Sequence, residues 1–509
     1  MNTNQLKLGS LLSYGQMALG IIISLVYTPA MIRLLGQSEY GLYNTVASTI
    51  SMLSILSLGF NSSYIRYYSR YKQSGDDKRI HSLNGLFMLI FIIIGLVAFS
   101  CGLFLSLNLE LVFSDGLTAG EYRIARVLMI LLSVNLGLSF PMSVFTSIIS
   151  AHERYVVLKL LAMMKTVVGP LVSLPMLLLG YGSIAMVSVT LGISLLTDLI
   201  YFFYVRRKLH CRFVFRDFEK GLFRQLLVFT AFIALNLIVN EVNTNIPKFL
   251  LGRFRGTGAV AIYSVGYTLY QYYMTFSTSI SGVFTPRVHR LVQSNLENPG
   301  EQRRVLTELF VKVGRIQYAV LAMIATGFIL FGRPFIAFWA GEEYGEAYYV
   351  TLLLILPSTI ALTQNVGIEI QRALNRHQFR SIVYIFMAAI NLGLAIFLCQ
   401  IYGTVGATVG TAASLLIANG LIMNIYYHKR CYVNILTFWK NIGRMSLGML
   451  PALAVGIGMN LLFDIRGTWE MLLGIGVYAL VYCAGMWLLG LNEFEKDLIR
   501  KPLRKLMRF

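Results

Sequence analysis

Long apolar stretches separated by short polar loops run through almost the whole chain, and no other feature limits the fold as strongly. Fourteen of these stretches approach or exceed the roughly 20 residues that a helix needs to cross a bilayer. Of the 509 residues, 56% are hydrophobic and 13% are charged, about half the charged fraction of a soluble domain. A water-soluble fold has too little interior to bury so much apolar surface. The sequence therefore predicts an all-α integral membrane protein with about 14 transmembrane helices.

The expected spans are 8–32, 41–63, 83–107, 124–150, 158–179, 184–204, 225–251, 260–285, 314–338, 348–371, 382–401, 406–427, 443–463 and 470–490. Positive charge is distributed unevenly between the loops that join them. One alternate set of loops, which includes both termini, holds 33 of the 43 lysines and arginines, and the other set holds 7. Because cytoplasmic loops carry the excess of positive charge, both termini are predicted to be cytoplasmic. The net charge of +20 then mostly faces anionic membrane lipids, and nucleic-acid binding is not expected.

Several function classes lack the motifs that they require. The five cysteines are scattered and contain no Cys-x-x-Cys pair, so we interpret them as free thiols rather than as a disulfide framework or a metal site. The sequence contains no Gly-x-x-x-x-Gly-Lys-[Ser/Thr] run, and no cofactor is expected. The longest expected external loop, 108–123, is too short for a catalytic domain. No catalytic residues are assigned, and a membrane enzyme such as a glycan polymerase is disfavoured.

The chain also repeats itself with a period near 220 residues. The matches are Leu34-Leu35-Gly36 with Leu250-Leu251-Gly252, Phe60 and Arg66 with Phe284 and Arg290, Ala151 and Arg154 with Ala373 and Arg376, and Tyr181-Gly182-Ser183-Ile184 with Tyr402-Gly403-Thr404-Val405. Four matches in order and at nearly one offset indicate two copies of a six-helix unit. Because six is an even number, both copies cross the membrane in the same direction.

This repeat predicts two pseudo-symmetric six-helix lobes plus two extra C-terminal helices. The first lobe and a cytoplasmic linker occupy 1–224, the second lobe occupies 225–442, the extra helices occupy 443–490, and an amphipathic cytoplasmic tail occupies 491–509. Two facing lobes are the geometry of a transporter, because rocking one lobe against the other exposes the cleft between them to each side in turn. The sequence therefore predicts transport by alternating access.

A family resemblance lies in two places along the chain. Arg33-Leu34-Leu35-Gly36-Gln37-Ser38-Glu39-Tyr40-Gly41-Leu42-Tyr43 resembles the Leu-Gly-x-x-x-Tyr-Gly-x-Tyr signature of bacterial polysaccharide flippases, which belong to the multidrug/oligosaccharidyl-lipid/polysaccharide exporter superfamily. The seventh span, from Pro247-Lys248-Phe249-Leu250-Leu251-Gly252 to Ile262-Tyr263-Ser264, is similar to the start of that family's second lobe. The fourteen-span layout agrees, so the resemblance covers essentially the whole chain. It departs at Asn243-Thr244-Asn245, where many relatives carry an aspartate.

The resemblance implies a flippase that moves an undecaprenyl-pyrophosphate-linked oligosaccharide across the bacterial plasma membrane, for capsule, O-antigen or another surface polysaccharide. Its partners would be this lipid-linked oligosaccharide and the polymerase and glycosyltransferases of the same pathway. The departure at the seventh span leaves the coupling ion open. Two alternatives also stay open, which are a cation-coupled multidrug exporter of the same superfamily and a flippase for a lipid-linked peptidoglycan precursor.

Charged residues inside the expected spans are the candidate site, because a charge at the bilayer centre is costly and is usually retained for contact with protein or a water-filled cavity. On the seventh span, Glu241, Asn245 and Lys248 share one helix face. They form either a cleft wall, with Lys248 on substrate phosphate and Glu241 on a proton or cation, or a polar contact between helices. Lys165 and Asp198 lie at similar depth on neighbouring spans, either as an ion pair or with Lys165 facing the cleft.

Two arginines near the outer ends of spans complete the candidate set. Arg33 and Arg126 either attract the diphosphate at the outer mouth or anchor the helices at the interface. A third mid-span lysine, Lys159, lies near the interface and is able to extend into water. Three lysines against Asp198 and Glu241 favour an anionic cargo over the cationic drugs that a multidrug exporter carries. Asp198 and Glu241 are also the candidates for ion coupling.

Overall fold

The computed structural model of the chain describes residues 3–113, 117–216, 221–294, 298–463 and 467–506, and within them it contains helices and no strand. Nine helical runs in this part of the chain are long and apolar enough to cross a membrane, or ten if the bent pair α11–α12 is counted as one span. The all-α, multi-pass membrane architecture is therefore confirmed. The count of fourteen spans is not confirmed.

Two reasons explain the lower count. The runs 12–73 and 378–430 each contain two expected spans, because the helix continues past a sharp kink at Gly36 and at Gly403 instead of ending there. In addition, the expected spans 225–251 and 260–285 coincide with α7 and α8, which are not among the nine. Every expected span nevertheless lies on helical structure.

The chain forms two compact units. Unit 1 comprises Met1–Ser264 and Cys399–Gly403, and unit 2 comprises Val265–Leu398 and Thr404–Phe509. This division follows packing, whereas the expected lobe boundary at residue 224 follows the sequence repeat, and the lobe boundaries remain predictions. Residues 507–509 of the expected tail lie outside the described residues.

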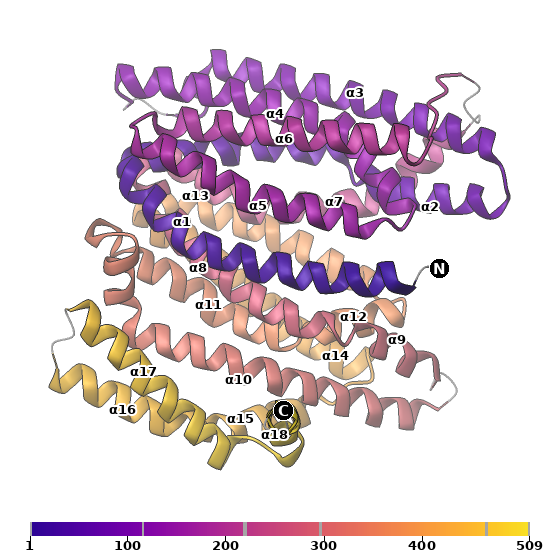
Figure 1. Cartoon of the computed structure of the whole chain (residues 1–509). Coiled ribbons are helices and arrows are strands. Elements are labelled where there is room, and N and C mark those ends of the chain that lie inside the picture. Colours follow the sequence, from indigo (N-terminus) through magenta and orange to yellow (C-terminus); the bar gives the residue numbers. More distant parts are fainter. Residues whose placement is uncertain (1–2, 114–116, 217–220, 295–297, 464–466, 507–509) are drawn as a thin grey trace. The chain divides into compact units, whose positions relative to one another are not determined.

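The helices that lie within unit 1 are α1 (Thr3–Met52), η1 (Leu53–Ser57), α2 (Phe60–Gln73), α3 (Asp77–Leu107), η2 (Leu109–Leu111), α4 (Ala119–Ala151), α5 (Tyr155–Leu178), α6 (Gly182–Arg207) and α7 (Leu222–Phe254). α8 (Thr257–Gly282) begins in unit 1 and continues in unit 2. Figure 1 shows α3, α4 and α6 side by side, and α4 packs against both of the others.

The remaining helices belong mainly to unit 2. They are α9 (Thr285–Ser294), α10 (Pro299–Trp339), η3 (Glu342–Tyr344), α11 (Ala347–Thr363), α12 (Asn365–Ala373), α13 (Gln378–Leu415), the π-helix η4 (Leu416–Ile422), α14 (Met423–Arg430), α15 (Ile435–Ser446), η5 (Leu447–Met449), α16 (Leu450–Leu462), α17 (Thr468–Gly485), the π-helix η6 (Met486–Gly490) and α18 (Glu493–Leu506). The two extra C-terminal helices are the hairpin of α16 and α17, which lie side by side in Figure 1.

Local sequence signals place the helix starts. Thr118 caps α4 through its side chain, which accepts from the backbone N–H of Glu121, while the Glu121 carboxylate accepts from the backbone N–H of Thr118 at 2.8 Å. This reciprocal capping box satisfies two backbone donors that a helix start leaves free. Asp76 caps α3 with a single bond, by accepting from the backbone N–H of Arg79 at 3.1 Å.

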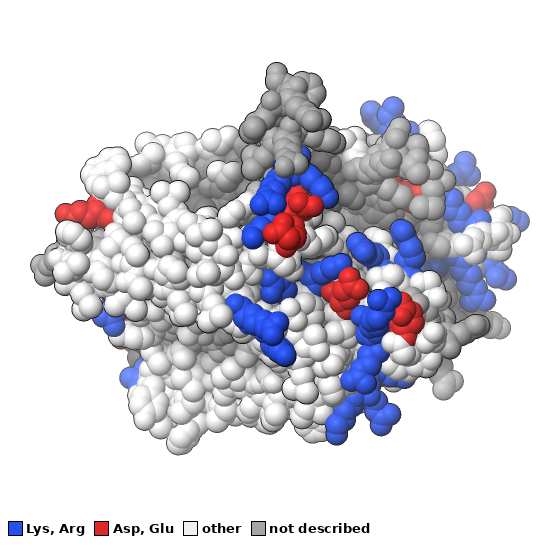
Figure 2. All heavy atoms as spheres, turned by 90° about the horizontal axis from the view of Figure 1, so that it is seen from below, with Lys and Arg blue, Asp and Glu red and all other residues white. Residues whose placement is uncertain are grey.

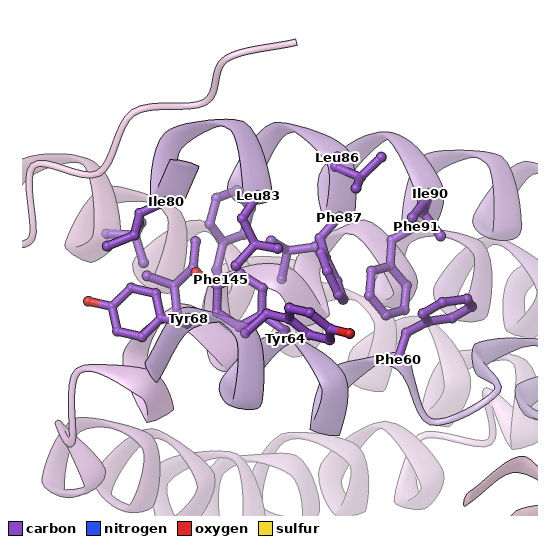
Figure 3. Packing of buried hydrophobic residues seen from close by; sticks show 14 of the residues in the cluster. Phe60, Tyr64, Tyr68, Ile80, Leu83, Leu86, Phe87, Ile90, Phe91 and Phe145 are labelled. Atoms are coloured by element: carbon purple, nitrogen blue, oxygen red, sulfur yellow. The ribbon is translucent and has the colours of Figure 1, made fainter. Parts of the chain in front are cut away.

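Aromatic residues of α2 and α3 form much of one hydrophobic cluster of unit 1 (Figure 3). The ring of Phe60 meets those of Phe87 and Phe91 edge-on, with both centroid distances at 6.3 Å. Tyr64 is fully buried, and its hydroxyl donates to the side-chain oxygen of Asn84 at 2.7 Å. Buried tyrosine hydroxyls need such partners, so this core fixes the rotation of α2 against α3.

In unit 2, one buried arginine ties the C-terminal helices to α10. The Arg315 guanidinium contacts both carboxylate oxygens of Glu495, at 2.5 and 2.8 Å, and both side chains are about 5% exposed. It also donates to the backbone oxygens of Gly490 and Asn441, at 2.8 and 3.1 Å. We call this arrangement the Arg315–Glu495 latch, because it joins α10, α15, the end of η6 and α18 at one point.

The sequence repeat recurs as matched backbone turns. Three pairs of residues have a positive φ at corresponding positions, namely Glu153 (58°) and Asn375 (55°), Gly182 (65°) and Gly403 (59°), and His210 (51°) and Tyr432 (55°). Their separations are 222, 221 and 222 residues. A positive φ is uncommon outside glycine, so three coincidences at one offset indicate a shared backbone path. The repeat found in the sequence is therefore matched by similar local turns, and the two six-helix lobes remain a prediction.

Candidate functional site

The polar residues of α7 lie close together on one face of the helix. The Asn245 side-chain nitrogen donates to a carboxylate oxygen of Glu241 at 2.5 Å, and Asn245 is buried. Lys248, three residues further along, is half-buried and makes contacts of its own. The structure therefore orients the Glu241 carboxylate by an amide on the next turn, as the shared helix face suggested.

Lys165 and Asp198 come together at the packing surface of α5 and α6. The Lys165 ammonium donates to the Ser194 hydroxyl at 2.7 Å, and Ser194 lies one turn before Asp198 on α6. The charge of Lys165 also acts on the Asp198 carboxylate. Lys165 itself is largely exposed, whereas Asp198 is half-buried. Ser194 thus fixes the ammonium beside Asp198 while leaving the rest of the lysine accessible.

The helix α1 connects the two groups, because it packs against both α5 and α7. The Tyr27 hydroxyl on α1 lies 2.8 Å from the Ser173 hydroxyl on α5. Close to the C-terminal end of α7, a Cβ added at Gly252 would lie 2.5 Å from the methyl group of Thr45 on α1. Helices α1 and α7 therefore approach each other closely at this point. The charged groups of α5 and α7 are therefore carried by two helices that share one neighbour.

The segment that resembles the flippase signature has a clear structural role. Gly36 has φ 72° and ψ 168°, which breaks the helical path of α1. The Glu39 carboxylate then accepts from the backbone N–H and the hydroxyl of Ser183, both at 2.6 Å, and so caps the start of α6. Gly41 packs so tightly that a Cβ would lie 1.9 Å from the Thr257 carbonyl oxygen. The signature thus specifies a break, a cap and a close helix contact.

The two outer arginines are both exposed. Arg33 lies on α1, three residues before the Gly36 break, and Arg126 lies two turns into α4. Their exposure is compatible with contact to substrate and with anchoring at the interface. Arg253 and Arg255, to which sequence reasoning gave no role, are instead engaged with backbone. Arg255 donates to the carbonyl oxygens of residues 399, 400 and 401, which lie just before the kink at Gly403.

Unit 2 contains a polar network that sequence reasoning missed. The Arg380 guanidinium lies 4.7 Å from the centre of the Tyr384 ring, and the Tyr384 hydroxyl donates to the Asn419 side chain at 2.7 Å. Asn419 lies in the π-helix η4, and its backbone oxygen accepts from the Asn424 side chain at 2.7 Å. Arg380 lies near the start of α13, so this network joins α13 to η4 and α14.

The same network reaches a break in the neighbouring span. α11 and α12 meet at Gln364 with a bend of 43°. The Gln364 amide donates to the Asn424 side-chain oxygen at 2.8 Å, and the Trp439 indole N–H donates to the same oxygen at 3.1 Å. The sequence feature that could have predicted this network is the presence of uncharged amide side chains within apolar spans, because each amide needs a hydrogen-bond partner when it is buried.

A family model described as "Polysaccharide biosynthesis protein" matches residues 9–292, more than half of the chain. The "Probable low-salt glycan biosynthesis flippase Agl15" of Haloferax volcanii is 23% identical over 236 residues. That alignment covers 46% of this chain and 48% of the relative, so the chain matches about half the length of this protein.

Solved structures share the fold along most of the chain. A structure named "Lipid II flippase MurJ, inward closed conformation" has a TM-score of 0.70 at 16% identity and covers 97% of this chain and 99% of that one. An inward-facing multidrug resistance MATE family transporter of the MOP superfamily has a TM-score of 0.61 at 13% identity and covers 85% of this chain and 99% of that one. The chain therefore has the fold of these membrane transporters.

Proposed function

We propose, from the premise that this chain belongs to the polysaccharide biosynthesis protein family, that it is a flippase for a lipid-linked oligosaccharide. The proposed cargo is an undecaprenyl-pyrophosphate-linked repeat unit of capsule, O-antigen or another surface polysaccharide. The proposed direction is from the inner to the outer leaflet of a bacterial plasma membrane, with both termini in the cytoplasm. The family match over residues 9–292 is the observation that carries this proposal.

The charges of unit 1 support an anionic cargo. A diphosphate headgroup with its sugars cannot cross about 30 Å of hydrocarbon unaided, because its charges and hydroxyls would lose their hydration. Lys165 on α5 and Lys248 on α7 supply positive charge within helices that otherwise are mostly apolar. Charge-assisted hydrogen bonds to such ammonium groups replace part of the lost hydration. In this proposal the headgroup passes these lysines as the transporter alternates between its two states.

The lipid tail need not enter the polar path. An apolar cavity of about 300 Å³ lies between α8, α10 and α17 in unit 2, with Phe276, Phe328 and Tyr478 among its lining residues. Its lining is almost entirely apolar side chains, which suit part of a polyprenyl chain better than they suit sugars or phosphate. A tail held there or in the bilayer leaves only the headgroup to be moved.

Energy for transport would come from an ion gradient, the membrane potential or removal of the product, since the sequence has no nucleotide-binding run. Asp198 and Glu241 are the proposed coupling residues. Both are carboxylates in expected membrane helices, and each has a polar side chain nearby, Lys165 for Asp198 and Asn245 for Glu241. In the proposed pathway, glycosyltransferases supply the cargo and a polymerase consumes it.

The first test is mass spectrometry of lipid-linked glycans from cells depleted of this protein. Accumulation of an undecaprenyl-pyrophosphate oligosaccharide together with loss of one surface polysaccharide is the expected result, and it would identify the cargo. Accumulation of a lipid-linked peptidoglycan precursor would instead indicate that the protein is a flippase for that precursor. Unchanged glycans with increased sensitivity to cationic drugs would overturn the proposal in favour of a multidrug exporter.

A second measurement separates transport from synthesis. Single repeat units that still reach the outer leaflet in depleted cells would indicate a polymerase and would contradict a flippase. Restoring the chain on a plasmid should return the surface polysaccharide to its normal level. Restoring a Lys248→Ala variant at the same expression level should not.

A further inference from the structure

A polar groove of about 610 Å³ lies in unit 2, where α10 and α15 begin and where the turn before α18 passes. It is lined by Gly300, Arg303, Arg304, Thr307, Glu308, Val311, Lys312, Asn434, Thr437, Asn441 and Asn492. None of the residues assigned to the proposed transport path lines this groove. It is therefore a separate feature, and its chemistry is independent of the proposed cargo.

Cations outnumber carboxylates in this groove. Arg304 is paired with Glu301 at 2.6 Å, and Lys312 is paired with Glu308 at 2.6 Å. The exposed guanidinium of Arg303 has no ion pair with any of the described residues. The positive charge of Arg303 is therefore not neutralised by an ion pair. Arg304 and Lys312 each have further N–H donors besides those that contact their carboxylate partners.

Two asparagines add donors of fixed orientation. The side-chain oxygen of Asn434 accepts from the backbone N–H of Thr437, at 3.3 Å, and that of Asn492 accepts from the backbone N–H of Glu495, at 2.9 Å. Each oxygen is held by a helix start, so each side chain keeps its NH2 group for a further partner. A ligand with several acceptor oxygens and negative charge, such as a phosphate group, satisfies these donors.

Apolar side chains flank the polar lining. Leu436, next to Thr437 on α15, is 74% exposed, and Phe494 on α18 is 42% exposed. The Lys312 ammonium lies 5.0 Å from the centre of the Phe494 ring, so the aromatic side chain borders the cationic wall. Figure 2 shows one face of the molecule, on which lysines and arginines gather beside a broad area without charge. A molecule with a phosphate head and an apolar tail matches this combination better than a free anion.

We propose that this groove binds the phosphodiester headgroup of an anionic phospholipid, with an acyl chain beside Leu436 and Phe494. Arg303 supplies the unpaired charge, and Asn434 and Asn492 supply neutral donors. Soluble phosphate esters share the headgroup chemistry but lack the apolar part.

Binding at this site would also stabilise the docking of α18. Asn492, which lines the groove, makes reciprocal capping bonds with Glu495, and Glu495 is the carboxylate of the Arg315–Glu495 latch. Asn441, a second lining residue, offers its backbone oxygen to Arg315. A phosphate that holds Asn492 and its neighbours therefore fixes the start of α18 and the latch together.

The test uses the full-length protein purified in a neutral detergent, and native mass spectrometry counts the lipids that it retains. Phosphatidylglycerol and phosphatidylcholine are offered in separate titrations, and inorganic phosphate and ATP are offered as competitors. We expect retention of phosphatidylglycerol over phosphatidylcholine. Arg303→Gln should weaken that retention about fivefold, the effect of one cation at an anionic surface. Lys440→Gln is the matched control, because Lys440 is an exposed cation of α15 that does not line the groove.

Hydrogen exchange of α18 gives a readout that does not depend on counting lipids. Phosphatidylglycerol should slow exchange of 493–506 in the wild-type protein and in Lys440→Gln, and it should have less effect in Arg303→Gln. Equal loss of lipid in both variants would overturn the site, because it would reflect general surface charge. Displacement by millimolar inorganic phosphate or ATP would assign the groove to a soluble phosphate ester and reject the lipid. Retention of neither lipid would reject the proposal outright, whatever the outcome of the glycan measurements.

Discussion

The two units of the protein share backbone features but differ in their charges. Unit 1 carries Lys165, Asp198, Glu241 and Lys248 within its long helices, where hydrogen bonds come from single neighbours such as Ser194. Unit 2 instead connects amides, a tyrosine and one arginine in a network around the bend between α11 and α12, and its buried ion pair ties down the C-terminal helix. The comparison shows that helices joined by similar turns can carry different polar side chains, namely separate charged groups in unit 1 and a connected amide network in unit 2.

The matched turns show what both copies retain. Glu153 and Asn375 share a positive φ, and the next residue of each turn donates its backbone N–H to a carbonyl five residues earlier, Arg154 to Ile149 and Arg376 to Gln371. Turns of this kind decide where the chain reverses, and many side chains on the intervening helices can change without disturbing them.

The largest expected effect concerns the buried latch of unit 2. Arg315→Leu alone and Glu495→Leu alone should each lower the free energy of unfolding by about 3–5 kcal/mol, because each leaves a buried charge without its partner. The double variant should recover most of this loss, since apolar residues of similar volume often replace a buried pair without penalty. Thermal unfolding in one detergent would measure all three. A double variant as unstable as the sum of both singles would show that the latch matters through its other hydrogen bonds.

The second prediction concerns the tight contact made by the signature segment of unit 1. Gly41→Ala should destabilise the protein by about 1–3 kcal/mol, because its Cβ would meet the Thr257 carbonyl oxygen and force the helices apart. Gly192→Ala on α6 is the control, since a Cβ there meets nothing within 4 Å and alanine favours a helix interior. Thermal unfolding again provides the comparison. If both variants were equally stable, the close approach would not determine the packing of unit 1.

The third prediction compares two lysines of unit 1 in transport. Lys248→Ala should lower export of the surface polysaccharide about tenfold, the loss expected for one charge-assisted contact of roughly 1.5 kcal/mol. Lys159→Ala should have a smaller effect, because that side chain lies near the N-terminal start of α5 and can reach water. Surface glycan is quantified at matched expression. Equal glycan levels in the two variants would contradict the ranking and remove Lys248 from the proposed path.

The smallest expected effect concerns a half-buried histidine of unit 1, His152, whose counterpart in unit 2 is Leu374. Its Nδ1 lies 2.9 Å from the Ile148 carbonyl oxygen, and its Nε2 lies 3.0 Å from the Tyr68 hydroxyl. Burial lowers the pKa of His152, the hydrogen bond to Ile148 opposes this shift, and the charges of Lys72 and Arg154 add to it. The unfolded chain therefore binds a proton more readily than the folded one.

Stability should then fall as the pH drops below 6.5, the ordinary pKa of histidine, and level off below the folded-state pKa. The slope is at most about 1.4 kcal/mol per pH unit for one proton. His152→Leu, which gives unit 1 the residue of unit 2, should flatten this part of the profile. Thermal unfolding measured on both sides of pH 6.5 tests this. An unchanged slope in the variant would assign the acid sensitivity to other groups.

Sequence periodicity predicted which candidate residues share a helix face, but it did not predict their contacts across helices. Helical periodicity placed Glu241 and Asn245 on one face, and their hydrogen bond agrees with that. The same reasoning offered either an ion pair between Lys165 and Asp198 or a Lys165 that faces the cleft; in the structure the ammonium donates to Ser194, and its charge also acts on Asp198. A hydroxyl one turn away competes for the same donor, and the outcome depends on how α5 and α6 are rotated against each other.

The sequence by itself determined the membrane character, the all-helical class and the repeat, because hydropathy and turn-forming residues act over a few neighbours. Tertiary structure decided which distant groups meet. Glu39 caps a helix that begins more than 140 residues later, and Arg315 pairs with Glu495, 180 residues away. Contacts of this kind depend on the rotation and depth of whole helices, which the packing of all their neighbours sets together. Local sequence patterns therefore do not predict these long-range contacts.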